Sequence, residues 1–341
     1  MSRAVAPRAA IVGIAGPHLT SEEAALLRRL PPSGVILFGR NCVDRAQLSR
    51  LTASLRECVA ADLPILIDQE GGRVMRLRPP VWPELPPMGM LGELDAVDPA
   101  AAERLLRLAA GVIGAVLHEV GIDVDCAPVL DLRMPETTRA IGDRSFGADP
   151  ERVGRLGHIA IETLRARGVA PVIKHLPGHG RAIVDSHVEL PVVDAPLELL
   201  RAQDFVPFRA CADAGLGMTA HLLFPAIDAE LPATLSPVVI DRIIRGEIGF
   251  SGVLMSDDLC MGALSGEPAA RACRALDAGC DLALYCSGVL AETAAVLEAV
   301  PPLPETRQES LAAARKAAGG DRAPFDVEAA QTELAALRAT A

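Results

Sequence analysis

Short apolar runs rich in Val, Ile and Leu alternate along the chain with longer segments in which apolar residues recur at helical spacing. Five of the longer segments predict helices, at 22–30, 45–61, 100–120, 151–167 and 197–214. The short runs predict eight strands, at 10–14, 34–38, 64–67, 122–124, 171–173, 216–220, 253–255 and 282–285. Because these runs are continuously apolar, they are typical of strands buried on both faces of a parallel sheet.

Eight successive strand–helix units predict an α/β protein with a single (β/α)8 barrel of the TIM type, a fold of ~250 residues before insertions. An open, doubly wound sheet is the main alternative, but no G-x-G-x-x-G follows the first strand, as a dinucleotide-binding version would require. We assign residues 1–302 to the barrel. After Leu303 the chain is rich in Ala, Glu and Arg and contains breakers at 319–320 and 324. Residues 303–341 are therefore predicted to form a helical extension packed on the barrel.

Composition excludes several classes of function. The 341 residues carry a net charge of −11 and only 3% aromatic residues, which argues against a nucleic-acid surface. None of the eight cysteines forms a C-x-x-C pair, which favours a reducing compartment over disulfides or a zinc cage. The apolar stretch at 9–15 is interpreted as a strand rather than a signal peptide, and no run reaches the ~18 apolar residues of a membrane span. We expect a cytoplasmic monomer that binds neither nucleic acid nor membrane.

Polar residues directly follow four of the predicted strands: Asp68, the pair Lys174–His175, His221 and Asp257. In a (β/α)8 barrel the chemistry lies at the C-terminal ends of the strands. Charged groups gathered at one edge of a buried sheet cost free energy unless they pair or bind something. The pattern therefore predicts a polar pocket at this end of the barrel.

The segment KHLPGHGRAIVDSH, residues 174–187, contains a candidate proton carrier. Its proline and glycines allow a tight loop to leave the strand. Asp185 lies two residues before His187, close enough for the carboxylate to orient and charge the imidazole, whose ordinary pKa of about 6.5 suits proton transfer. For an isolated D-S-H, a turn with a surface histidine would be the commoner outcome. Within the longer segment, proton transfer is the favoured interpretation.

Four further residues each have a functional and a structural interpretation. Asp257 offers a nucleophile or general base, yet Asp257 or Asp258 could equally cap a following helix. Asp68 and Arg76 bracket a glycine pair, either as an ion pair that holds the loop or as ligand-binding groups. Arg144 could offer its planar fork to a hydroxyl or carboxylate, or could be a solvated surface side chain.

Taken together, six motifs carry a resemblance to a known family: GVILFGRN at 34–41, DQEGGRVMR at 68–76, IGDRSF at 141–146, KHLPGHG at 174–180, DSH at 185–187 and SDDLCM at 256–261. The chain resembles the bacterial β-N-acetylhexosaminidases of glycoside hydrolase family 3, single-barrel enzymes of cell-wall recycling. The resemblance extends to about residue 287, and KHLPGHG followed by DSH is its most specific part.

The resemblance implies a role for each matching residue. It implies that Asp257 is the catalytic nucleophile and that His187 is the acid/base, tuned by Asp185. It implies no metal and no cofactor. The sugar-binding positions that it implies are Asp68, Arg76, Arg144, Lys174 and His175.

The implied activity is retaining hydrolysis of terminal β-linked N-acetylglucosamine from muropeptide fragments, in which this sugar is joined to anhydro-N-acetylmuramic acid. Three alternatives stay open. The Asp257–Asp258 pair could support substrate-assisted catalysis by the N-acetyl group. A metal-dependent barrel hydrolase could use His175, His179, His187 and Asp257. A barrel without catalytic activity could simply bind the sugar.

Overall fold

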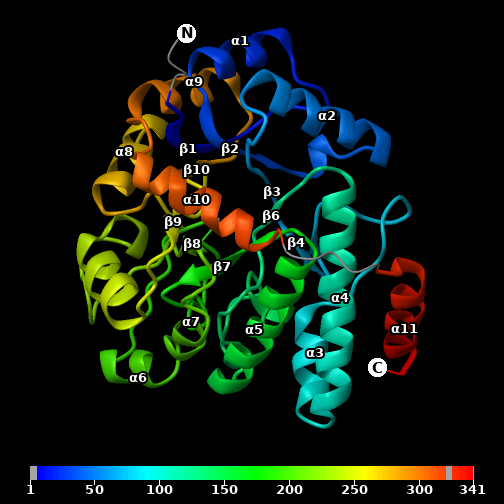
Figure 1. Ribbon diagram of the computed structural model, residues 1–341. Helices are drawn as coiled ribbons and strands as arrows, with labels where there is room; N and C mark the ends of the chain where they lie inside the picture. The colour runs from blue at the N-terminus through cyan, green and yellow to red at the C-terminus, as the bar shows by residue number, and fades with distance from the viewer. Residues whose placement is uncertain (1–5, 187, 320–324, 341) are drawn as a thin grey trace.

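The computed structural model describes residues 6–186, 188–319 and 325–340. Its core is an eight-stranded parallel sheet in the order β10-β1-β2-β3-β6-β7-β8-β9, and a bridge between Met255 and Leu282 joins the two outer strands into a barrel. The (β/α)8 prediction is confirmed (Figure 1). The barrel strands are β1 (Arg8–Gly13), β2 (Pro32–Leu37), β3 (Ile65–Ile67), β6 (Val124–Asp125), β7 (Ala170–Leu176), β8 (Leu216–Thr219), β9 (Val253–Met255) and β10 (Ala283–Tyr285).

The strands are buried on both faces, which is why their sequences are continuously apolar. In β1, Ala9 and Ile11 belong to a cluster that fills the inside of the barrel, whereas Ala10 and Val12 belong to the larger cluster under the helices. Neighbouring residues of a strand thus serve two different cores, because side chains alternate across the sheet.

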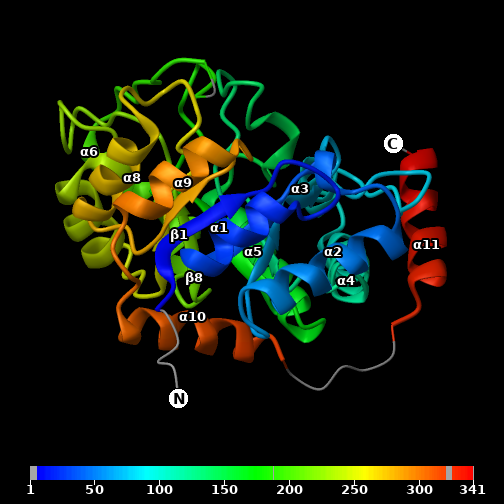
Figure 2. The same ribbon diagram turned by 90° about the horizontal axis from the view of Figure 1, so that it is seen from above.

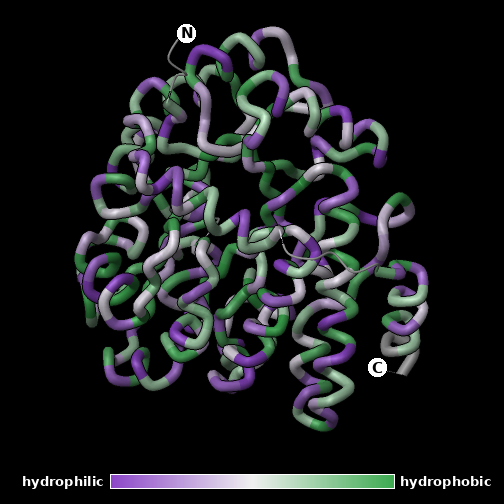
Figure 3. The backbone as a smooth tube through the Cα atoms, viewed as in Figure 1, coloured by the Kyte–Doolittle hydropathy of each residue, from purple (hydrophilic) through white to green (hydrophobic). Residues whose placement is uncertain are grey.

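The helices surround the sheet, and their colour in Figure 3 alternates between hydrophobic and hydrophilic residues. Their N-termini carry the expected caps: Thr20 and Glu23 form a capping box on the first helix, and Asp44 and Asp149 cap two others. The helices are α1 (Ser21–Arg29), α2 (Arg45–Cys58), α3 (Met88–Asp95), α4 (Pro99–Glu119), α5 (Pro150–Ala166), α6 (Leu197–Ala202), α7 (Val206–Ala210), α8 (Pro268–Asp277), α9 (Leu290–Ala299), α10 (Glu305–Ala317) and α11 (Val327–Thr340), with a π-helix at Val239–Glu247.

The prediction of one helix over 197–214 is wrong, because α6 and α7 are separated by a turn. Pro207 lies in the first turn of α7, where its missing N–H costs nothing, whereas inside a longer helix it would break a hydrogen bond. In the turn, Asp204 accepts a hydrogen bond of 2.7 Å from Nε of Arg181, which belongs to the loop after β7. The turn between α6 and α7 therefore holds the loop after β7 through this hydrogen bond.

The N-terminal end of the barrel is closed by α10, which crosses the ring of strands in Figure 1 and lies beneath it in Figure 2. Leu303, Leu311 and Ala318 join the inner cluster of the barrel. Arg315 forms an ion pair with Asp123 and so ties α10 to the segment before β6. Further along, α11 packs against α4. The domain boundary at residue 302 stays a prediction.

At the opposite end the strands open into the longer loops. After β3 the chain forms an antiparallel hairpin of β4 (Gln69–Gly71) and β5 (Val74–Met75), which extends the wall of the barrel. Within the described part of the chain, no helix has the length and apolar character needed to cross a membrane.

Candidate active site

A cavity of about 330 Å³ opens at the C-terminal ends of the strands. It collects the predicted site residues from loops that are far apart in the sequence, as the barrel fold leads one to expect. His187 lies outside the described residues, so its position is not part of this description. Of the other predicted residues, His221 does not line the cavity. Those that do are Asp68, Arg76, Arg144, Lys174, His175, Asp185 and Asp257.

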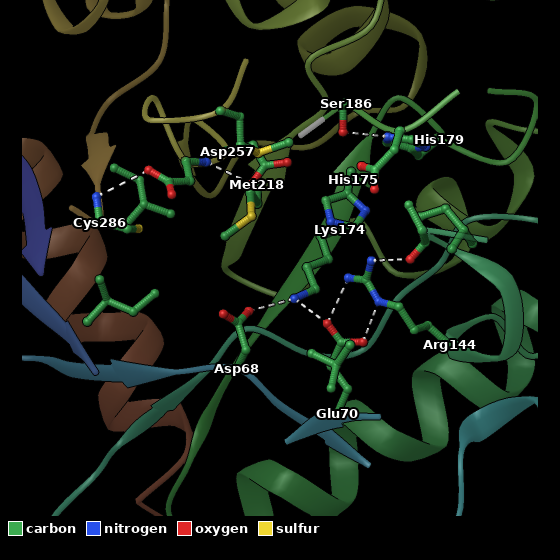
Figure 4. Close-up of a pocket in the computed structure, with 18 of the residues that line it drawn as sticks. Asp68, Glu70, Arg144, Lys174, His175, His179, Ser186, Met218, Asp257 and Cys286 are labelled. Atoms are coloured by element: carbon green, nitrogen blue, oxygen red, sulfur yellow. Dashed lines mark hydrogen bonds and ion pairs between the residues drawn. The ribbon is translucent and has the colours of Figure 1, made fainter. Parts of the chain in front are cut away.

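One wall of the cavity is a network of charges centred on Lys174, whose side chain is only 2% exposed (Figure 4). Its Nζ lies 2.8 Å from Oδ1 of Asp68 and 2.6 Å from Oε1 of Glu70. Arg144 forms a bidentate ion pair with Glu70, in which Nε and Nη2 of the guanidinium lie 2.7 and 2.8 Å from the carboxylate oxygens. The guanidinium of Arg144 is therefore held by a carboxylate, and Arg144 is not a solvated surface side chain.

The oppositely charged side chains of this wall keep one another in their ionised forms. Burial alone would raise the pKa of Glu70, but Arg144 and Lys174 hold it at about 2, against an ordinary value of 4.5. Burial opposes ionisation of Asp68 too, yet Lys174 and Arg76 keep its pKa well below the usual range. The two carboxylates in turn raise the pKa of Lys174 against the effect of burial. Fixed charges next to a small cavity are suited to binding sugar hydroxyls.

Gln69 holds the hairpin that carries this wall. Its Oε1 accepts hydrogen bonds from the backbone amides of Arg76 and Leu77, at 2.9 and 3.0 Å, and its Nε2 donates to the Leu77 carbonyl. The Arg76 side chain can then reach Asp68, with Nη2 3.0 Å from Oδ2. The Asp68–Arg76 ion pair thus exists, and it lies on the cavity wall.

A buried carboxylate, Asp131, organises the second wall. Its Oδ2 lies 2.6 Å from Nδ1 of His175, and its Oδ1 accepts the backbone amides of His175 at 3.2 Å and His179 at 2.6 Å. Burial would raise the pKa of Asp131, but His175 lowers it, so the group stays charged. Because Nδ1–H of His175 donates to a carboxylate, Nε2 is left as the nitrogen free to meet a ligand.

The loop after β7 is firmly held at its base and exposed at its tip. Gly180 packs so closely on Leu132 that a Cβ there would lie 2.2 Å from the Leu132 carbonyl oxygen. At the tip, Ile183 and Val188 are 67% and 75% exposed, while Ser186 is buried. The Ser186 hydroxyl lies 3.2 Å from Nε2 of His179, and burial lowers the pKa of His179 to about 4. A neutral imidazole therefore supports the segment that contains Asp185.

Asp257 and Asp258 have separate tasks in the turn after β9. Both line the cavity, and Oδ1 of Asp257 accepts a 2.7 Å hydrogen bond from the Asp258 amide. Asp258 turns its Oδ1 toward the backbone amides of Cys260 and Cys286, at 3.0 and 3.2 Å. Neither caps a helix directly, since α8 begins only at Pro268, and that interpretation is corrected. Burial would raise the pKa of Asp257, but the nearby His175 lowers it, which keeps a carboxylate in the cavity.

Comparison with known proteins decides the family. The profile of the glycosyl hydrolase family 3 N-terminal domain matches residues 8–318. The chain belongs to glycosyl hydrolase family 3. It is 41% identical to a β-hexosaminidase of Nitrosospira multiformis, over 81% of this chain and 80% of that one, and 42% identical to a β-hexosaminidase of Thiobacillus denitrificans, over 81% and 77%.

The fold of this family 3 chain also matches solved structures. NagZ from Neisseria gonorrhoeae in complex with N-trifluoroacetyl-D-glucosamine superposes with a TM-score of 0.87 and 33% identity, over 98% of both chains. The same protein has also been solved in complex with a zinc ion. The predicted family and the enzyme class, a glycoside hydrolase, are confirmed.

The metal-dependent alternative finds little geometric support in the part of the chain that the structure describes. There, no group of three or more His, Cys, Asp or Glu side chains is arranged to hold a metal ion. Nδ1 of His175 is engaged by Asp131, and Nε2 of His179 by Ser186. The fourth residue of that alternative, His187, lies outside the described residues.

Sequence reasoning missed Glu70, Gln69 and Asp131 as site residues. Asp131 follows the apolar pair Val129–Leu130 after β6, which is the same signal that identified Asp68 and Asp257. Glu70 gave no such signal, because its partner Arg144 lies 74 positions away in the sequence.

Proposed function

We propose that this family 3 chain is a retaining β-N-acetylglucosaminidase that removes terminal, non-reducing N-acetylglucosamine from muropeptide fragments. The observation that carries the proposal is the pairing of an ionised Asp257 with a charged wall of Asp68, Lys174 and Arg144 across one small cavity. The β-hexosaminidase names of the relatives support the reaction type. The ligand in the gonococcal NagZ structure, an N-acylated glucosamine, supports the sugar.

In the proposed first step, a carboxylate oxygen of Asp257 attacks the anomeric carbon and the glycosidic C–O bond breaks. The proton needed by the departing oxygen comes from His187, which Asp185 charges and orients. In the second step, neutral His187 removes a proton from water, whose oxygen attacks the anomeric carbon and releases Asp257. Two displacements at one carbon retain the β configuration.

A histidine acid/base suits a site with this electrostatic character. Retaining glycosidases usually place two carboxyl groups about 5–5.5 Å apart, so that each charge disfavours the other. A histidine that alternates between cationic and neutral forms does not repel Asp257. The site already holds Asp68, Glu70 and Asp131 as carboxylates, and a further anion would add to the repulsion.

The chain offers few aromatic rings for stacking on sugars, since it has one Trp and one Tyr. Recognition of the N-acetylglucosamine ring is therefore assigned to charged donors and acceptors. We infer that Asp68, Lys174 and Arg144 bind its hydroxyls and that Nε2 of His175 supports them. Arg76 acts on the ring through Asp68, which it orients.

Substrate-assisted catalysis is the main mechanistic rival. It needs a carboxylate beside the catalytic one to orient the N-acetyl group, and Asp258 lines the same cavity while its Oδ1 accepts two backbone amides. The trapping experiment separates the two mechanisms, because substrate-assisted catalysis forms no covalent bond to Asp257. The remaining rival, a metal-dependent hydrolase, predicts loss of activity in the presence of a chelator.

A trapping experiment tests the proposal. An activated fluorosugar analogue of N-acetylglucosamine should label the protein once, on Asp257, and NMR should show the β anomer of N-acetylglucosamine as the first product. Labelling of another residue, failure to trap any covalent species, or an α first product would contradict the mechanism.

A further inference from the structure

His221 is a fully buried histidine beside the active site that the proposed mechanism does not use. It follows β8, the strand next to β9, but it does not line the cavity. Its ring lies between two polar groups: Nδ1 is 2.8 Å from the Thr234 hydroxyl, and Nε2 is 3.0 Å from the backbone carbonyl oxygen of Asp258. Buried polar groups with two such partners define a single orientation of the ring.

The partners fix the position of the proton on this ring. A carbonyl oxygen can only accept, so Nε2 carries the hydrogen that it donates to Asp258. Burial lowers the pKa of His221. The single hydrogen of the Thr234 hydroxyl has two acceptors within reach, Nδ1 of His221 at 2.8 Å and the Ala220 carbonyl oxygen at 3.0 Å. Thr234 can in turn accept from Thr219, whose hydroxyl oxygen is 2.7 Å away. The bond from Nε2–H to the Asp258 carbonyl does not depend on which acceptor the Thr234 hydroxyl uses.

The turn that presents Asp257 is held from more than one side. On the β10 side, the Leu259 amide donates to the Leu284 carbonyl at 2.9 Å, and the Asp258 carboxylate accepts the Cys286 amide at 3.2 Å. On the β8 side, the side-chain contact is the hydrogen bond from His221. Arg271 also donates to the carbonyls of Leu259 and Met261. His221 therefore supplies the side-chain bond on the β8 side of a turn that is held from several directions.

We propose that His221 is a positioning residue for the nucleophile: its Nε2–H fastens the Asp258 carbonyl to β8 and thereby fixes the turn that aims Asp257 into the cavity. The inference rests on the proposed role of Asp257. It assigns no proton transfer to His221. Its effect is on the geometry of attack, to which rates are very sensitive: a displacement of 1 Å can lower a rate ~10²-fold.

Three substitutions separate positioning from general structural support. His221→Leu removes the donor and keeps an apolar side chain in the site. His221→Gln places an amide N–H near the original Nε2, so it should restore the bond to the Asp258 carbonyl. Thr234→Val removes the partner of Nδ1 while leaving the donor to Asp258 in place. His158→Leu, on the outer face of α5 and half-exposed, is the matched control for loss of a histidine.

Two readouts are compared for each variant: the rate of covalent labelling by the fluorosugar and the affinity for N-acetylglucosamine, measured by calorimetry. We expect His221→Leu to lower the labelling rate ~10²-fold with affinity changed less than about threefold, since the sugar is bound by the other wall. His221→Gln should recover most of the rate, and Thr234→Val should have a smaller effect than His221→Leu. His158→Leu should behave as the wild type.

The inference is overturned if His221→Leu is labelled at the wild-type rate. It is also overturned if His221→Leu and His221→Gln lose rate and affinity together, because this would indicate collapse of the site. If the wild type itself is not labelled on Asp257, it is the proposed function that fails, and that result is distinguishable from both of the others.

Discussion

The two ends of the barrel bury side chains of opposite character, apolar at one end and charged at the other. At the N-terminal end, Leu303, Leu311 and Ala318 fill the opening with apolar groups beneath α10. At the C-terminal end, Lys174 and Glu70 are buried to a similar degree, at 2% and 3% exposure, but they are charged. Removing apolar surface from water stabilises a fold, whereas removing charges from water costs free energy even when they pair.

The comparison suggests why one sheet can both stabilise the fold and present charged groups to a ligand. Most of the stability is supplied by the apolar layers and the closed end, so the open end can hold ionised groups that stay charged only with their partners and that present hydrogen-bonding atoms to a ligand. Changes at the open end should therefore act mainly on activity, and changes at the closed end on the free energy of unfolding.

Asp257→Ala should show the largest difference between the effect on activity and the effect on stability. Loss of the nucleophile should lower kcat by on the order of 10⁴-fold, comparable with removal of a nucleophile from other covalent enzymes. The thermal unfolding midpoint should fall only slightly, because the fold lowers the pKa of Asp257 and the Asp258 amide loses its acceptor, while the apolar core is unchanged. Steady-state kinetics and calorimetry on the same preparation would check both. An active Asp257→Ala variant would refute the assignment.

Lys174→Met should be the exception at the open end, because it should lower both the stability of the fold and the affinity for the sugar. It leaves Asp68 and Glu70 as neighbouring carboxylates without their shared cation, and removing one partner of a buried pair costs about 3–5 kcal/mol. The affinity for N-acetylglucosamine should fall too. Urea unfolding and calorimetric titration are the measurements. A variant with wild-type stability would show that the charged wall is less coupled than its distances indicate.

Acid should destabilise the open end through Glu70. Its pKa is about 2 when folded and 4.5 ordinarily, so the folded state binds fewer protons than the unfolded state between these values. The stabilising contribution is complete above pH 4.5 and is lost as pH falls toward 2, by on the order of 3 kcal/mol. Unfolding free energy measured between pH 6 and 3 should fall less steeply in Glu70→Gln. Identical slopes would contradict the assignment.

Leu311→Ala should act on the closed end alone. The cavity left beneath the barrel should lower the free energy of unfolding by about 2–3 kcal/mol, with kcat/KM unchanged within error. Leu290→Ala is the matched control, because Leu290 is 38% exposed and should lose less than about 0.5 kcal/mol. A loss of activity in Leu311→Ala would show that the two ends are coupled.

The barrel could be predicted from the sequence because each strand is marked locally by a continuous apolar run, and the strand ends then pointed to Asp68, Lys174 and Asp257. The fork of Arg144 around Glu70 could not be assigned, since it depends on a contact between separate loops. The break between α6 and α7 did have a local signal, Pro207 inside the helical pattern, and the prediction of one helix overlooked it. His221 was noticed at a strand end, but its partner Asp258 lies 37 positions away.

The most direct test of the account is the release of 4-nitrophenol from its β-N-acetylglucosaminide, beside the β-glucoside, with and without EDTA. The account predicts rapid turnover of the N-acetylglucosaminide, little turnover of the glucoside, and the same rates with and without chelator. No turnover of either substrate, or turnover that EDTA abolishes, would contradict the proposed function.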